Sequence, residues 1–196
     1  GEMMDYVGAV YGDDDVYEKI EAFDHKTIDG HAPGVSNKAL NAYCVAGVET
    51  DHECTDPNEL IEKVKRGMYI HLREGSQTKN VADLLPGLSP NYYHRILMCS
   101  DDLHLNDIVN IGHIDHNINI AIENGIDPVQ AISMATINAS ECYKLHKIGA
   151  IAPGYQADLV TFDSLEDIKV DRVYKKGKLV AKKGQALFNT EPYQSD

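Results

Sequence analysis

The sequence predicts an α/β fold with a parallel sheet, followed by a small β module. Short apolar runs end repeatedly in a histidine or a carboxylate, and a helical apolar pattern separates each run from the next. The spacing of these ends equals one strand, one helix and two short loops. Around Gly149 the pattern changes to alternating strands, with a hairpin turn at Lys176–Lys178. Parallel strands need a crossover helix between them, so the first part is expected to form βα units.

The helix boundaries are marked by capping residues. Asp56-Pro57 and Asp127-Pro128 are typical helix openings, Ser36 is a good N-cap, and Gly47 is a typical stop. Helices are expected over 16–24, from Ser36 to Gly47, from Asp56 to Gly67, over 81–85, from Ile114 to Gly125, and from Asp127 through Met134. Strands are expected at Thr27–His31, Val48–His52, Met68–Arg73, Arg95–Ser100, Ala157–Phe162, Val170–Tyr174 and Leu179–Ala181.

Three segments are expected from these patterns: 1–148 for the α/β part, 149–186 for the β module and 187–196 as a linker or tail. The chain opens on Gly1-Glu2-Met3-Met4, without an initiator methionine. This opening is typical of the interior of a domain and predicts a fragment or a processed product.

Composition narrows the functional class. The net charge is −13, from 18 basic and 31 acidic residues, which argues against a nucleic-acid or anionic-membrane partner. No apolar run reaches the roughly 18 residues of a membrane span, and no signal-peptide pattern opens the chain. The four cysteines are scattered without a CxxC spacing, as expected for reduced thiols in a cytoplasmic protein.

The strand ends carry the residues of interest. His31, His52 and Asp101 each follow a different expected strand, and Glu2 could join them if it also ends a strand. The carboxyl ends of parallel strands meet at one edge of a sheet, where active sites form. Imidazoles and carboxylates that converge there can hold a divalent metal and leave a position for water.

Plainer interpretations exist for each candidate. A single histidine after a strand is commonly a surface residue, Asp101-Asp102 could be a helix N-cap, and Arg73-Glu74 could be a surface ion pair. The acidic run Asp13–Asp15 and the pair Asp101-Asp102 lack the D-x-D-x-D-G spacing of a calcium loop. The matched placement of two histidines and an acidic partner favours the metal site.

Seven stretches carry motifs of one known family: Glu2-Met3-Met4, Ile28–Gly34, Asp51–Thr55, Arg73–Ser76, Cys99–Asp102, Met134–Ala139 and Gly149–Val160. With them the chain resembles the adenine deaminases of the amidohydrolase superfamily over about residues 1–185. The motifs DGHAPG, DHECT and REGS are far more specific to adenine deaminases than the passage around Gly149, which is generic to the superfamily.

The resemblance implies part of a (β/α)8 barrel, comprising about strands four to eight, and part of a composite β-sandwich domain. It implies a binuclear centre of manganese or iron, with zinc possible by ligand chemistry. It also implies hydrolytic deamination of adenine to hypoxanthine and ammonia. The residue roles that it implies are Glu2, His31, His52 and Asp101 as metal ligands, Asp101 and Glu74 as catalytic residues, and Arg73, Glu53 and Asp102 as substrate-binding residues.

Three alternatives stay open. Asp102 could replace Asp101 as the last-strand ligand. The activity could instead be that of another amidohydrolase, acting on a cyclic amide or another nucleobase, or the chain could be a non-catalytic assembly module.

The sequence departs from the family pattern at one point. The family's His-x-His pair on the first strand is absent from the sequence, so the chain alone is expected to bind metal poorly and to associate with the missing N-terminal portion or with another copy.

Overall fold

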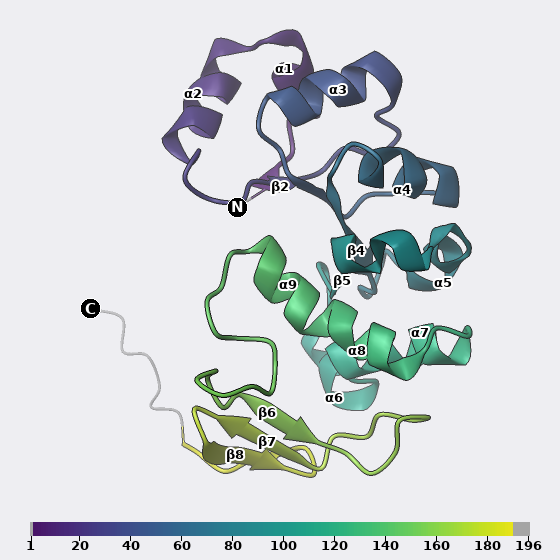
Figure 1. Cartoon of the computed structure of the whole chain (residues 1–196), viewed down its shortest axis with the longest axis vertical. Helices are drawn as coiled ribbons and strands as arrows, with labels where there is room; N and C mark the ends of the chain where they lie inside the picture. Colours follow the sequence, from purple (N-terminus) through teal and green to yellow (C-terminus); the bar gives the residue numbers. More distant parts are fainter. Residues whose placement is uncertain (1, 190–196) are drawn as a thin grey trace.

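A computed structural model describes residues 2–189. Its first part contains a parallel sheet in which β1 pairs with β2, β3 with β4, and β4 with β5. An isolated parallel bridge from Ile28 to Val48 connects the two groups of strands. The strands are β1 Glu2–Met3, β2 Asp29–Gly30, β3 Thr50–Asp51, β4 Tyr69–Arg73 and β5 Ile96–Cys99. The predicted α/β class with a parallel sheet is therefore confirmed (Figure 1).

Helices connect the strands and cover the sheet (Figure 1). The aspartates Asp56 and Asp127 accept backbone N–H groups at the starts of α4 and α8, as predicted. Ser36 precedes α3 in an extended conformation, but in the described structure its side chain makes no capping hydrogen bond. The helices are α1 Tyr6–Tyr11, α2 Asp14–Ala22, α3 Asn37–Val45, α4 Pro57–Val64, α5 Val81–Leu84, α6 Leu105–Asn110, α7 Ile114–Glu123, α8 Pro128–Ala135 and α9 Ile137–Cys142, with 3-10 turns at Leu85–Gly87 and Pro90–Arg95.

Some elements differ from the sequence-based expectation. Helices α1, α6 and α9 were not predicted, because each is only six residues long and has little apolar periodicity. The expected strand Val48–His52 forms only Thr50–Asp51, since the ladder with β4 covers those two residues. His52 thus lies just beyond the ladder, in a loop.

The core lies between the sheet and the helices. Ile70 and Leu72 of β4 point to this side and are fully buried, as is Leu60 of α4. Side chains alternate along a strand, so His71 and Arg73 of β4 point to the opposite face of the sheet. That opposite face is where the candidate site lies.

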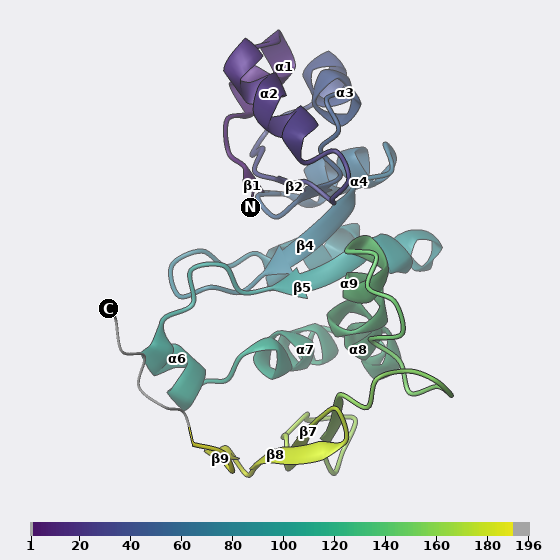
Figure 2. The same ribbon diagram turned by 90° about the vertical axis from the view of Figure 1, so that its left-hand side faces the viewer.

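The second part is an antiparallel sheet of β6 Leu159–Thr161, β7 Arg172–Lys175, β8 Lys178–Lys182 and β9 Gln185–Ala186. Both turn residues between β7 and β8, Lys176 and Gly177, have positive φ, which matches the predicted hairpin. Helix α7 lies between β5 and this sheet (Figure 2). Asn119 of α7 exchanges two hydrogen bonds with the backbone of Ile168, which fixes the β module against the helix.

The remaining expectations concern the segment boundaries and membrane-spanning segments. The boundaries 1–148, 149–186 and 187–196 stay predictions, and residues 190–196 of the expected tail lie outside the described residues. Within residues 2–189, no helix has the length and apolar character needed to cross a membrane.

Candidate metal centre

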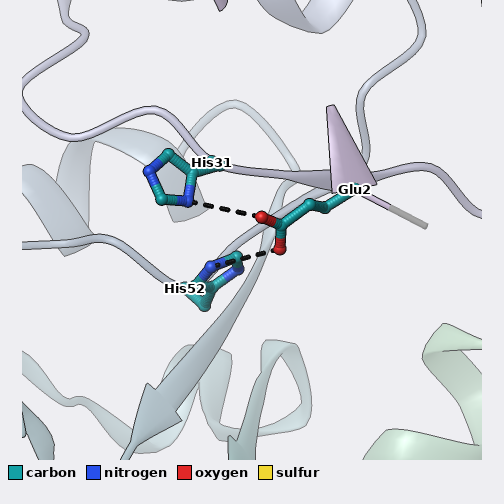
Figure 3. A group of neighbouring side chains, drawn as sticks. All are labelled: Glu2, His31 and His52. Atoms are coloured by element: carbon teal, nitrogen blue, oxygen red, sulfur yellow. Dashed lines mark ion pairs between the residues drawn. The ribbon is translucent and has the colours of Figure 1, made fainter. Parts of the chain in front are cut away.

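Three strand ends bring Glu2, His31 and His52 together at the carboxyl edge of the sheet (Figure 3). His31 Nδ1 lies 3.7 Å from Glu2 Oε1, and His52 Nε2 lies 3.5 Å from Glu2 Oε2. The two imidazole rings meet edge to face, with centroids 5.3 Å apart. One donor atom from each residue lies within 4.8 Å of the others, which is the arrangement that a shared cation requires.

The chemistry of these donors fits a divalent metal. His31 Nδ1 is buried and has no hydrogen-bond partner among the described residues. A buried, unpaired nitrogen is costly unless something binds it. A cation at this point would coordinate that nitrogen and neutralise the Glu2 carboxylate, so the residues present can hold the metal that the sequence predicts.

Glu53 belongs to a second donor group, with His52 and Asp101. Its Oε1 lies 3.4 Å from His52 Nε2 and 3.6 Å from His31 Nδ1. The backbone N–H of Glu53 donates to Asp51 Oδ2, two residues earlier, which forms an Asx turn that directs Glu53 back toward the donors. The sequence assigned Glu53 to substrate binding; that assignment stays a prediction, and the geometry also permits a ligand role.

Arg73 provides the positive charge of the site. It is buried, and its Nη1 donates to Asp101 Oδ2 at 2.7 Å and to Glu53 Oε1. Its Nε is buried without a partner among residues 2–189. Arg73 therefore links the carboxylates of two different strand ends, and its substrate-binding role stays a prediction.

The two adjacent aspartates occupy different environments. Asp101 has a positive φ of 53°, a left-handed conformation that few non-glycine residues adopt, and its carboxylate faces Arg73 and the donors. Asp102 instead accepts the backbone N–H of Gln77 at 2.9 Å and packs against Gly75. The geometry thus favours Asp101 over Asp102 as the residue that faces a metal.

Glu74 does not join the donors in the described structure. Its backbone N–H donates to the carbonyl of Cys99, so the residue continues the strand, and its side chain alternates to the face opposite Arg73. It is buried beside Lys79, 3.2 Å away, in a pocket that His113 and His116 also line. The predicted catalytic role of Glu74 is not supported by this placement and stays untested.

A cavity of about 190 Å³ opens beside the donors. His71 lines it and is buried, and burial lowers its pKa to about 4. His71 is not among the candidates taken from the sequence, although its position two residues before Arg73 predicts the same face of the strand. The cavity is lined by Glu2, Asp29, His52, His71, Cys99, Asp101 and Tyr143.

Lys63 is a further residue that the sequence did not reveal. It is fully buried, and its ammonium forms ion pairs with Asp51 at 2.8 Å and Glu59 at 2.6 Å. Burial lowers the pKa of Lys63, but the two carboxylates outweigh this effect and raise the pKa above its ordinary value. The one available signal was a Glu–Lys pair four residues apart on the apolar face of α4.

A parallel sheet with helices, and a cluster of histidines and carboxylates at its carboxyl edge, defines the class of metal-dependent hydrolases built on β/α barrels. Comparison with known families agrees with this class: the amidohydrolase family matches residues 1–180, and the chain belongs to that family.

The most informative relatives are bacterial. The chain is similar to the adenine deaminase of Petrotoga mobilis, at 47% identity over 96% of this chain and 33% of the relative. It is 49% identical to the adenine deaminase of Dehalococcoides mccartyi, over 97% of this chain and 34% of that relative. The chain therefore spans about a third of the length of these relatives.

A solved structure supports the fold. The β-aspartyl dipeptidase of Fervidobacterium islandicum AW-1 matches 91% of this chain with a TM-score of 0.69, although the match covers 53% of that protein and the sequence identity is 17%. At this identity the similarity concerns the fold alone. It confirms the predicted partial barrel, since the match extends over about half of an amidohydrolase-type structure.

Proposed function

We propose that this chain supplies metal ligands and the proton-transferring carboxylate for the hydrolytic deamination of adenine to hypoxanthine and ammonia. The observation that carries the proposal is the convergence of Glu2, His31 and His52, all in motifs by which the chain resembles adenine deaminases. The 45–49% identity to curated adenine deaminases over nearly the whole chain supports the substrate.

The proposed roles follow from the geometry. Glu2, His31 and His52 would hold a divalent metal, with manganese or iron proposed and zinc compatible with the same donors. When bound there, the metal would supply Lewis acidity for the activation of water. Asp101, at the edge of this group, would accept a proton from the water and transfer it to the departing amino group.

Arg73 has a role that the structure supports directly. Because its guanidinium contacts Asp101 and Glu53, it would hold both carboxylates toward the cavity. The cavity would receive the purine, a planar ligand whose ring nitrogens and amino group can form hydrogen bonds. Asp101 would then lie between the nucleophile and the leaving amine, as a proton-transfer group must.

Three further assignments belong to the same proposal. The segments 1–148 and 149–186 would be parts of a β/α barrel and of a composite β domain. The protein would be cytoplasmic. The open edges of the parallel sheet would be covered by the remaining barrel strands or by a second copy, because an uncovered edge readily pairs with other strands.

Activity can be tested in a chimera. This chain would replace the matching segment of the Petrotoga mobilis relative, and adenine-dependent ammonia release would be measured with manganese present. The expected result is turnover that the Asp101→Asn variant lowers by several orders of magnitude with most of the metal retained.

The same assay separates the alternatives. A folded, metal-loaded chimera that ignores adenine but consumes cytosine or a dihydropyrimidine would identify another amidohydrolase activity. A chimera that folds and binds metal without consuming any of these substrates would favour the non-catalytic interpretation. A fully active Asp101→Asn variant would exclude Asp101 as the proton-transfer group.

A further inference from the structure

The ammonium of Lys63 connects helix α4 to the loops behind the metal centre. Its three protons are matched by three acceptors: the carbonyl of Ala32 at 2.7 Å, Asp51 Oδ2 at 2.8 Å and Glu59 Oε1 at 2.6 Å. Lys63 and Asp51 are both fully buried. This is therefore a completely satisfied polar network inside the apolar core.

The Asp51 carboxylate ties together the two histidine-bearing segments. Asp51 immediately precedes His52, and its Oδ1 accepts the backbone N–H of Ala32, the residue after His31, at 2.8 Å. Its Oδ2 accepts both Lys63 and the N–H of Glu53. One side chain thus fixes the backbone next to His31 and on both sides of His52.

Glu59 fixes the same two segments further along. Its Oε1 accepts the N–H of Gly34 at 2.7 Å, and its Oε2 accepts both the N–H and the hydroxyl of Thr55. Lys63 bridges Glu59 and Asp51, so the four-residue spacing on α4 sets the separation of the two loops. No member of this network contacts the cavity beside the donors.

Asp51, Cys54 and Glu59 also lie close enough together to be considered as a cation site. The Lys63 ammonium already occupies the position between the two carboxylates, which leaves no room for a second positive charge. Burial raises the pKa of the Cys54 thiol, so the sulfur stays protonated and is a poor ligand. This cluster is accordingly a structural network.

We propose that Lys63, with Asp51 and Glu59, is a positioning residue that holds His31 and His52 in the geometry that binds the metal. The proposal rests on the metal centre of the proposed function. Burying three charged groups is expensive, and apolar side chains of the same volume commonly pack at no cost in stability. The network's distinctive consequence is therefore geometric, since it orders both ligand loops before any metal arrives.

The first test removes the charges together, in the triple variant Lys63→Met, Asp51→Asn, Glu59→Gln. Each amide keeps one oxygen that accepts a loop N–H group, whereas its NH2 replaces the second carboxylate oxygen, and no buried carboxylate is left unpaired. The variant is made in the chimera with the Petrotoga mobilis relative, because this chain alone is expected to bind metal poorly. We expect the variant to fold with a lower unfolding temperature, and its manganese affinity, measured by calorimetry, to fall about 10- to 100-fold, as for outer-shell partners of metal ligands. Manganese affinity equal to that of the unaltered chimera, in a folded triple variant, would overturn the proposal.

Arg66→Met is the matched control. Arg66 lies on the same helical region and pairs with Glu62 and Asn41, so it links α4 to α3, but it contacts neither ligand loop. This variant should keep the manganese affinity of the unaltered chimera. An equal loss in the control would show that any disturbance of α4 weakens the metal site, which would contradict a specific role of Lys63.

A second measurement needs no variant and decides the matter if the triple variant does not fold. In the unaltered chain without metal, the amide hydrogens of Ala32 and Glu53 should exchange as slowly as that of Ile70 in the central strand. Rapid exchange at both amides would show that the network does not order the loops. A lack of manganese uptake by the unaltered chimera would instead refute the metal centre, while the exchange rates still report on the network.

Discussion

The guanidinium of Arg73 lies against the carboxylate of Asp101, with Nη1 2.7 Å from Oδ2. The two residues come from neighbouring strands, β4 and β5, and meet where those strands end. The same guanidinium contacts Glu53, so a single buried cation balances two carboxylates beside the predicted ligands. Several predictions about charge, metal binding and stability depend on this arrangement and its neighbours.

Replacing Arg73 should destabilise the chain most when no metal is present. Arg73→Met leaves the carboxylates of Glu53 and Asp101 without their cation, and we expect a loss of about 2 kcal/mol in the free energy of unfolding, below the value for a fully buried pair because Asp101 is partly exposed. Manganese should reduce this loss, since it supplies positive charge nearby. Urea unfolding with and without manganese measures both values. Lys19→Met, which removes an exposed lysine of α2, is the control, and equal losses with and without metal would contradict the prediction.

His52→Ala should abolish most of the metal affinity with a smaller effect on folding. His52 Nε2 faces both Glu2 and Glu53, so its removal takes a donor from both groups. The manganese affinity is expected to fall by more than the roughly 10- to 100-fold that follows loss of an outer-shell partner. Calorimetric titration of the chimera with the Petrotoga mobilis relative measures this, and His25→Ala, at an exposed histidine, serves as control. Undiminished affinity in His52→Ala would exclude this residue as a ligand.

Gly75→Ala should be rescued in part by a second change at Asp102. A Cβ at position 75 would lie 1.6 Å from Asp102 Oδ1 and 2.8 Å from the carbonyl of Ser100. Overpacking of this kind costs about 1 to 3 kcal/mol, and we expect Gly75→Ala to lose that much. In the double variant Gly75→Ala, Asp102→Ala the first clash is gone, so the loss should be smaller than the sum of the single losses. A double-variant cycle in urea tests this; strict additivity would mean that the two residues are not in contact.

His71 should make the chain less stable in mild acid. Its pKa is lowered by burial to about 4 in the folded chain, against about 6.5 when unfolded, so the unfolded state binds the proton first as the pH falls. Neutral His71 therefore costs no stability above about pH 6.5. Between about pH 6.5 and 4 the free energy of unfolding falls progressively, by about 3 kcal/mol in total, because only the unfolded state is protonated there.

The measurement is urea unfolding of the metal-free chain across that pH range. His71→Gln should flatten the pH dependence by removing this group, whereas His25→Gln should leave the dependence unchanged. If the two variants lose stability in parallel between pH 6.5 and 4, the buried His71 is not the origin of the acid sensitivity.

Local pattern was enough to place the main candidates. His31, His52 and Asp101 each follow a strand, and the carboxyl ends of parallel strands meet at one edge, so their proximity follows from strand order. Glu2 lies within β1, beside β2, and joins His31 and His52 from there. The caps Asp56 and Asp127 were equally readable, because a capping aspartate acts within three residues of its own position.

Strand parity bears on the predicted catalytic role of Glu74. Glu74 follows Arg73 in a continuing ladder, so the two side chains point to opposite faces, and Glu74 lies beside Lys79 away from the donors. Glu53 shows the limit of the same rule. The chain leaves the ladder after Asp51 and turns through an Asx turn, which returns Glu53 toward His52.

The α/β class, the order of its elements and the edge at which histidines and carboxylates gather depend on periodicity and short-range capping, and they can therefore be predicted from the sequence. The burial of Lys63 between Asp51 and Glu59, and the pairing of Arg73 with Asp101, depend instead on how the folded segments pack. Those contacts include residues far apart in the chain. Packing removes certain charged groups from water, and each such group must then pair with an opposite charge. No local pattern encodes that pairing.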